Sequence, residues 1–291
     1  MSPANRKEAK MKFGTVLCNA LLVTVIAGTL TGCGKPAIDK ERVAVDESKG
    51  ILFSDNKQVL ERYNPKLKEK EYSAPSGVIT VGNRAFEKCS DLTNLTLPEG
   101  VSEIGERAFL SCTRLTTITL PASLRTIGDY AFENCRDLSI VAIPAGVTAI
   151  GKGVFKDCKK LTSVSIPADV QTVGFEAFYN CESLTSVTLP AEAKAIEDSA
   201  FEECESLTAI TVPDQVKSIG AKAFKKCKRL TSVTLPDSVT SIGPGAFEGC
   251  KELIRVRIPK NVKSIGAKAF DGCPCEKQIK SSFPSLYNYE S

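Results

Sequence analysis

A cysteine recurs every 23 residues through most of the chain, and this spacing constrains the possible fold more than any other feature. A phenylalanine stands three residues before each of these cysteines, and a proline keeps the same period. A fixed period of this length is typical of a solenoid or a propeller. A four-stranded propeller blade does not fit into 23 residues, so the period predicts a solenoid. The nine cysteines are Cys89, Cys112, Cys135, Cys158, Cys181, Cys204, Cys227, Cys250 and Cys273.

The first half of each unit has the pattern of a short β-strand, as residues 230–236 illustrate. Leu230, Val233 and Leu235 are expected to point into the core, while the hydroxyl side chains between them point to solvent. Pro236 is expected to end the strand, because it has no N–H to donate to a sheet.

The second half of the unit is expected to turn back across the core. Val239 and Ile242 form a second short apolar pair, and Gly243 is expected to adopt a positive φ at the corner. Ala246 and Phe247 then enter the core from a helical or 3-10 turn. One unit cannot cover its own apolar side chains, so nine stacked units are needed to form one continuous core.

The unit resembles the BspA-type leucine-rich repeat, whose consensus reads LTxVxLPxxVxxIGxxAFxxCxx and matches residues 69–275. The resemblance implies a leucine-rich repeat solenoid with parallel strands on one face. It also implies a bacterial surface protein that attaches to host or matrix proteins, or to other bacteria. Glu197 replaces the corner glycine of the consensus, and we expect a local bend there.

The two ends of the array depart from the repeat. Residues 51–68 are expected to form an N-terminal cap. After Cys273 only Ile279 stays in phase, so we expect a frayed final rung followed by a tail over residues 276–291. Atypical ends suit a solenoid, because uncapped ends would stack on another chain.

The N-terminus has the pattern of a lipoprotein signal. Basic residues precede an apolar run over residues 13–30, and Leu30-Thr31-Gly32-Cys33 looks like a bacterial lipobox. This predicts a signal peptide over residues 1–32, a lipid on Cys33 and a tether over residues 33–50. A transmembrane anchor is less favoured, because a span needs about 20 apolar residues. We therefore expect a location in the bacterial cell envelope, at the cell surface rather than in the periplasm.

Composition excludes several kinds of chemistry. The chain has no histidine, so the commonest general base and metal ligand is missing, and we expect neither an enzyme nor a cofactor. Without residues 1–32 it holds 34 basic and 33 acidic side chains, a balance that argues against nucleic-acid binding. Gly146 to Lys152 spells a phosphate loop, but Gly153 follows where Ser or Thr would hold magnesium.

The cysteine ladder allows three interpretations: a metal site, disulfides or buried free thiols. Zinc needs four clustered ligands, which a row of one cysteine per rung does not supply, so no metal is expected. Stacked rungs lie close enough for disulfides, but cysteine is among the most often buried residues, which favours free core thiols. Cys275 lies off the ladder, and its pairing within the last rung stays an open alternative.

Two surface patterns are candidates for binding. Lys225, Lys226 and Lys228 follow three glutamates by 23 residues, which favours charge compensation between rungs over a patch for polyanions. The exposed strand face is mostly small and hydroxylated. It includes Thr93, Thr96, Thr116, Thr119, Thr162, Ser163, Thr185, Thr188, Thr208, Thr211, Thr231 and Thr234.

The last rung departs most from this face, because it carries Ile254, Arg255 and Arg257 there. We predict that these three residues contact a ligand at the C-terminal end. The sequence as a whole predicts a lipid-anchored extracytoplasmic module for binding or adhesion, with an extracellular or envelope protein as partner. The alternative is a periplasmic scaffold for envelope structure or assembly.

Overall fold

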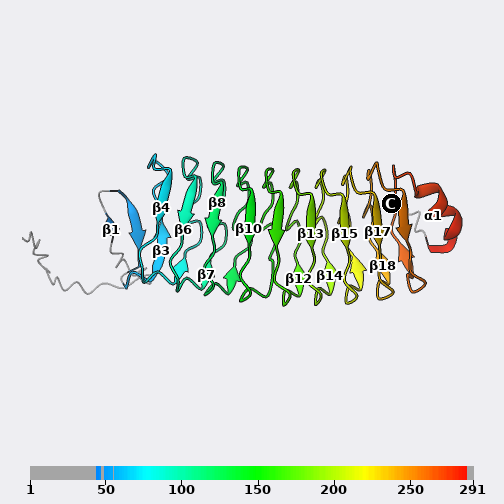
Figure 1. Cartoon of the computed structure of the whole chain (residues 1–291), viewed down its shortest axis with the longest axis horizontal. Coiled ribbons are helices and arrows are strands. Elements are labelled where there is room, and N and C mark those ends of the chain that lie inside the picture. Colours follow the sequence, from blue (N-terminus) through cyan, green and yellow to red (C-terminus); the bar gives the residue numbers. More distant parts are fainter. Residues whose placement is uncertain (1–43, 47–48, 55, 287–291) are drawn as a thin grey trace, which may run out of the picture. The chain divides into compact units, whose positions relative to one another are not determined.

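The computed structural model describes residues 44–46, 49–54 and 56–286. Contacts divide the chain into Met1–Lys40 and Glu41–Ser291, and every described residue belongs to the second unit. This unit is a solenoid in which short strands form two rows along successive turns (Figure 1). The predicted solenoid of 23-residue units is therefore confirmed. The predicted signal peptide, residues 1–32, and Cys33 lie outside the described residues.

The first row consists of strands of three residues, and we call its exposed side the strand face. Neighbouring strands are parallel and offset by one repeat, so that Ser232 pairs with Arg255. The row contains two sheets. One is β4 (Glu71–Ser73), β6 (Asn94–Thr96) and β8 (Thr117–Thr119); the other is β10 (Ile140–Ala142), β11 (Ser163–Ser165), β13 (Ser186–Thr188), β15 (Ala209–Thr211), β17 (Ser232–Thr234) and β19 (Arg255–Arg257).

The second row consists mainly of two-residue strands, which correspond to the second apolar pair of each unit. It also contains two sheets, with parallel pairing between repeats. The first runs through β1 (Ala44–Asp46), β2 (Ile51–Phe53), β3 (Val59–Arg62), β5 (Thr80–Val81), β7 (Glu103–Ile104) and β9 (Thr126–Ile127). The second runs through β12 (Thr172–Val173), β14 (Ala195–Ile196), β16 (Ser218–Ile219), β18 (Ser241–Ile242) and β20 (Ser264–Ile265).

The turn side of each repeat lies between the corner glycine and the cysteine. Its N–H groups alternate between a carbonyl three residues earlier and a carbonyl in the next repeat. Ala223 N donates to Gly220 O at 3.3 Å, whereas Phe224 N donates to Ala246 O at 2.7 Å. These segments are therefore turns joined to their neighbours rather than helices, because half of the donors leave the repeat.

The phenylalanines form one continuous stack through the core. From Phe86 to Phe270, neighbouring ring centroids lie 5.0 to 5.5 Å apart and the ring planes differ by at most 20°. Tyr63 continues the stack at 5.2 Å from Phe86, so the segment before the first repeat shares its core. Each such aromatic pair adds about 0.5–1.5 kcal/mol beyond the burial of its surface.

The corner glycine is required for a different reason from the one predicted. Gly243 is not among the residues with positive φ, so that expectation is wrong. A Cβ atom at Gly243 would lie 2.5 Å from the backbone nitrogen of Ala221 in the preceding repeat. The positive φ occurs two residues after a corner, as at Lys222, where φ is 55°. The glycine therefore permits a close approach of two backbones.

Glu197, which replaces the corner glycine in its repeat, lengthens the backbone hydrogen bond to the preceding repeat but does not break it. The Glu197 N–H lies 3.4 Å from Val173 O, whereas Gly220 N lies 2.8 Å from Ile196 O. Strand β14 still pairs with β12 and β16 on either side. Each row is instead divided into its two sheets about two repeats earlier, between β8 and β10 in the first row and between β9 and β12 in the second. In the second row, a single bridge joins Ile150 to Val173.

Each end of the array has its own structure. At the N-terminal end β1, β2 and β3 pair antiparallel before β3 joins the parallel row, so ordered pairing begins inside the predicted tether. At the C-terminal end the expected frayed rung is instead a helix, α1 (Glu276–Ser282), followed by the 3-10 turn η1 (Pro284–Leu286). Ile279 is buried and Phe283 packs against the core, because side chains four residues apart share one helix face. Neither helix in the described part of the chain is long and apolar enough to cross a bilayer.

We expect Gly243→Ala to lower the free energy of unfolding by about 1–3 kcal/mol, because its methyl group would overpack against the backbone of the preceding repeat. Urea denaturation of the full-length protein measures this change. Glu197→Ala is the matched control, since the same turn position already carries a Cβ, and its effect should stay below about 0.5 kcal/mol. Equal effects of the two substitutions would contradict the close-approach explanation.

Candidate functional site

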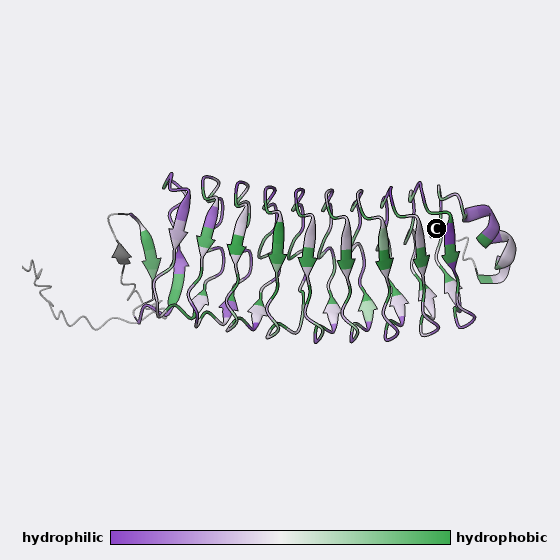
Figure 2. Ribbon diagram, viewed as in Figure 1, coloured by the Kyte–Doolittle hydropathy of each residue, from purple (hydrophilic) through white to green (hydrophobic). Residues whose placement is uncertain are grey.

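The strand face presents two columns of exposed side chains, from the first and third residues of each strand. In β17 these residues are Ser232 and Thr234, and the residue between them, Val233, is buried. Figure 2 shows the alternation as green segments between paler or purple ones along the arrows of this row. Most members of both columns are uncharged, so the middle of the face presents mainly hydroxyl and alkyl groups, among them Ile140, which is 62% exposed.

The threonines just before the strands have a structural role. Thr116 Oγ1 donates to Thr93 O at 3.0 Å, and Thr162 Oγ1 donates to Ser139 O at 3.1 Å. The same bond recurs in later repeats, as from Thr231 to the carbonyl of the preceding threonine. The sequence predicts that these threonines belong to the exposed strand face. In the structure, however, their hydroxyl groups donate hydrogen bonds to the preceding repeat.

The three predicted contact residues lie together at the C-terminal end of this face. Ile254 is 62% exposed, and both arginines of β19 are exposed. Arg257 Nη2 lies 3.1 Å from an Asp237 carboxylate oxygen, which holds one of the two guanidinium groups in place. Val256 is only partly buried, unlike Val233 in the preceding repeat, because no further repeat follows it.

Helix α1 turns this end into a groove, which we call the C-terminal groove. It is a cavity of about 390 Å³ between β19 and the helix. Its walls are Ile254, Arg255, Val256 and Arg257 on one side and Cys275, Gln278, Ile279, Ser282 and Phe283 on the other. The repeat pattern did not predict the helical wall, because only Ile279 stays in phase with the repeat after Cys273.

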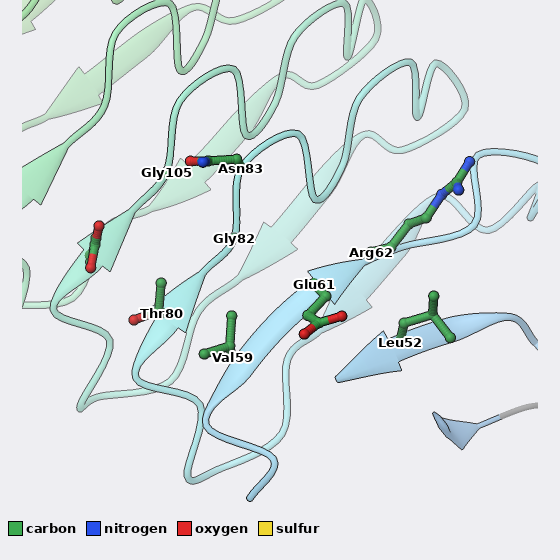
Figure 3. A pocket seen from close by; sticks show the side chains of 9 residues that line it. Leu52, Val59, Glu61, Arg62, Thr80, Gly82, Asn83 and Gly105 are labelled. Carbon is green, nitrogen blue, oxygen red and sulfur yellow. The ribbon is translucent and has the colours of Figure 1, made fainter. Parts of the chain in front are cut away.

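A second cavity, of about 450 Å³, lies at the N-terminal end of the second strand row (Figure 3). Glu61 and Arg62 of β3 line it together with Glu103 of β7. Asn83 also lines it, but its Oδ1 accepts the Glu106 N–H at 2.8 Å and so supports the next turn. The hydroxyl-bearing residue Thr80 of β5 lines the cavity as well. Among the described residues, no group of three or more carboxylates or cysteines is arranged to hold a metal.

On the turn side, lysines and glutamates of neighbouring repeats form ion pairs, as predicted. Lys226 pairs with Glu203 and Lys228 pairs with Glu205, each at 2.5 Å. Lys225 departs from the predicted pairing, because it contacts Glu248 of the following repeat at 2.9 Å. Such surface pairs each contribute about 0–1 kcal/mol, and they neutralise the cations that a polyanion would need.

The ten cysteines among the described residues are free and buried. From Cys112 to Cys273, each thiol of the ladder donates to the carbonyl of a phenylalanine in the preceding repeat. Cys181 Sγ lies 3.2 Å from Phe155 O, a carbonyl that also accepts the Cys158 N–H at 3.1 Å. Burial raises the pKa of the interior thiols, so they are protonated donors and poor nucleophiles. The raised pKa values are those of Cys112, Cys135, Cys158, Cys181, Cys204 and Cys227.

The comparisons with known proteins agree with this geometry. The chain matches a family model described as "BspA type Leucine rich repeat region" over residues 63–185 and 171–289. Among solved structures, it is similar to a leucine-rich repeat protein from Bacteroides ovatus, at 30% identity and a TM-score of 0.63. That alignment covers 76% of this chain, which spans 65% of the length of the Bacteroides protein.

Two further solved structures share the repeat at lower overall similarity. One is a leucine-rich repeat protein from T. pallidum, at 26% identity and a TM-score of 0.42, with 82% of this chain and 94% of that chain covered. The other comes from Eubacterium ventriosum, at 26% identity and a TM-score of 0.46, with 82% and 51% covered. No curated protein matches the chain.

The buried thiols predict a steep loss of stability at alkaline pH. A thiol whose pKa is raised on folding stabilises the fold fully below its unfolded pKa of about 8.5, and this contribution is lost as the pH rises above that value. Each of the six interior thiols with a raised pKa should cost about 1.4 kcal/mol of unfolding free energy per pH unit there. Urea denaturation of the reduced full-length protein at a series of pH values measures the slope.

Cys181→Ala provides the control for this slope. It should be about 1–2 kcal/mol less stable at neutral pH, because it leaves a small cavity. Above pH 9 it should lose less stability than the unsubstituted chain, by about 1.4 kcal/mol per pH unit. Parallel pH profiles for the two proteins would show that Cys181 titrates normally in the folded state.

Proposed function

The chain belongs to the BspA-type leucine-rich repeat family, and from this premise we propose that it is a lipid-anchored binding module of the bacterial cell surface. Its membership bears out the resemblance seen in the 23-residue consensus. The proposed role is to attach the cell to host, matrix or bacterial proteins through the strand face. The observation that carries the proposal is the strand face itself, which is continuous over the six strands from β10 to β19 and has no charged side chain in the strands from β10 to β17.

The C-terminal groove is the proposed centre of contact. Protein interfaces are richest in aromatic, aliphatic and arginine side chains at their centres, and they are poor in lysine and glutamate. Ile254 and Arg255 fit this description, since both are exposed and both line the C-terminal groove. A partner with an acidic, partly apolar surface would complement them. The rest of the strand face would then act as a flat area that excludes water around the centre.

The lipid anchor is proposed from the sequence alone. Cleavage before Cys33 would leave that cysteine as the first residue of the mature protein, with acyl chains attached to it. A catalytic role is not proposed, because the sequence has no histidine, which is the commonest general base.

We expect the solenoid to be removed from intact cells by an added protease. The measurement is an immunoblot for residues 69–275 after treatment, with a periplasmic protein as the internal control. Loss of the signal while the periplasmic control survives supports display at the surface. A signal that persists until the outer membrane is broken would contradict it, and would favour the alternative of a periplasmic scaffold.

We expect the triple variant Ile254→Thr, Arg255→Ser, Arg257→Thr to lose binding by about tenfold or more, as for a central contact region. The changes copy the residues of the preceding repeat, so the fold should be retained. The measurement is attachment of the purified full-length protein to immobilised extracellular-matrix protein. Ser186→Ala with Thr188→Ala, in the middle of the strand face, is the control and should have a smaller effect. An equal loss in both variants would contradict a contact centre at the C-terminal groove.

A further inference from the structure

Cys275 is set apart from the other cysteines that the structure describes, because it lies outside the 23-residue ladder. It occupies the N-cap position of α1, and its N–H donates to Leu253 O of the last repeat at 3.2 Å. Its side chain forms no capping hydrogen bond with the helix. The thiol is therefore not needed to begin α1, although only 4% of the residue is exposed.

The thiol of Cys275 contacts that of Cys273, the last member of the ladder. The two side chains are hydrogen-bonded to each other, and only Pro274 separates them in the chain. Two steps of about 3.8 Å between Cα atoms, bent at a turn, bring residues i and i+2 into the 4.4–6.8 Å range of disulfides. Because the two cysteines are buried side by side in the same turn, a covalent bond between them needs little movement of the backbone.

The pair also differs from the interior ladder in its access to solvent. The thiols from Cys112 to Cys250 belong to residues with no exposed surface, whereas Cys273 is 6% exposed. Cys275 lines the C-terminal groove, a cavity of about 390 Å³ that a small molecule can enter. A reagent in this groove would meet Cys275, because Cys275 lines the groove and Cys273 does not.

We propose that Cys273 and Cys275 are a modification site, which a small-molecule disulfide such as oxidised glutathione converts into an intramolecular disulfide. The Cys275 thiolate attacks one sulfur of the reagent and releases one glutathione thiolate. The Cys273 thiolate then attacks Cys275 Sγ in the mixed disulfide and releases the second glutathione. The protein loses two electrons and two protons, and the reagent gains them as two thiols.

The surroundings of the pair make this reaction dependent on pH. The hydrogen bond with the Cys250 side chain raises the pKa of Cys273 to about 12, and the hydrogen bond with Cys273 together with burial raises that of Cys275. The charged groups nearby are Glu276 of α1 and the arginines of β19. Since the thiolate is the nucleophile, the rate should rise about tenfold per pH unit between about pH 7 and pH 9.

The disulfide would fasten the start of α1 to the last repeat. Both walls of the C-terminal groove would then be covalently connected next to Arg255 and Arg257. The chemistry does not depend on the proposed function and can be tested on the purified protein. Its occurrence in cells does depend on export, because disulfides persist in oxidising compartments outside the cytoplasm.

The test uses the reduced full-length protein, incubated with oxidised glutathione and then denatured in N-ethylmaleimide. Trypsin should release Ala269–Lys277, which contains both cysteines of the pair and no others. Mass spectrometry should find this peptide lighter by two hydrogen atoms and without maleimide, while the ladder peptides from Cys112 to Cys250 carry one maleimide per cysteine. The fraction of closed peptide should grow about tenfold faster per pH unit.

Two variants check the order of events. Cys273→Ser should stop at a glutathione adduct on Cys275, because the second attack is lost. Cys275→Ser should leave Cys273 mostly free, because its access is through Cys275. A peptide Ala269–Lys277 that takes up two maleimides after oxidation would overturn the proposal, and so would disulfides spread equally along the ladder.

Discussion

The structure depends on one constraint, which is that no 23-residue unit can bury its own apolar side chains. Each interior phenylalanine ring therefore lies between the rings of the two neighbouring repeats, at centroid distances near 5 Å. Each ladder thiol from Cys112 to Cys273 donates to a carbonyl of the repeat before it, as Cys227 does to Phe201. The core is thus a set of contacts between neighbours, and it persists only while every repeat keeps the same register.

The close spacing of the repeats explains the other fixed positions. On the turn side, alternate N–H groups cross to the next repeat, which holds the backbones together at hydrogen-bonding distance. Gly220 and Gly243 lie where this approach leaves no room for a Cβ atom. Glu197 shows the effect of a side chain there, since its N–H bond to the preceding repeat is stretched to 3.4 Å. The exposed columns of the strand face carry no such constraint, so they are free to vary for binding.

Much of the fold was predictable from the sequence, because the same 23-residue pattern occurs nine times and each occurrence indicates the same packing. The strands, their inward residues and the buried cysteines all follow from that period. The role of Gly243 was mistaken, because a pattern of glycines cannot distinguish a positive φ from a close backbone approach. Helix α1 and its groove were missed for another reason: the ends of the array occur once, so Ile279 and Phe283 had no repeats with which to be compared. The N-terminal cavity was missed likewise.

Contacts between neighbouring repeats hold the solenoid together, and amide hydrogen exchange measures their strength repeat by repeat. The amides of the phenylalanine column, such as Phe201 N–H bonded to Ala223 O at 2.8 Å, report on those contacts. We expect these amides to exchange slowly in the interior repeats and at similar rates in adjacent repeats. Their protection should fall toward both ends of the solenoid. Fast exchange of these interior amides under native conditions, with the terminal segments protected, would contradict it.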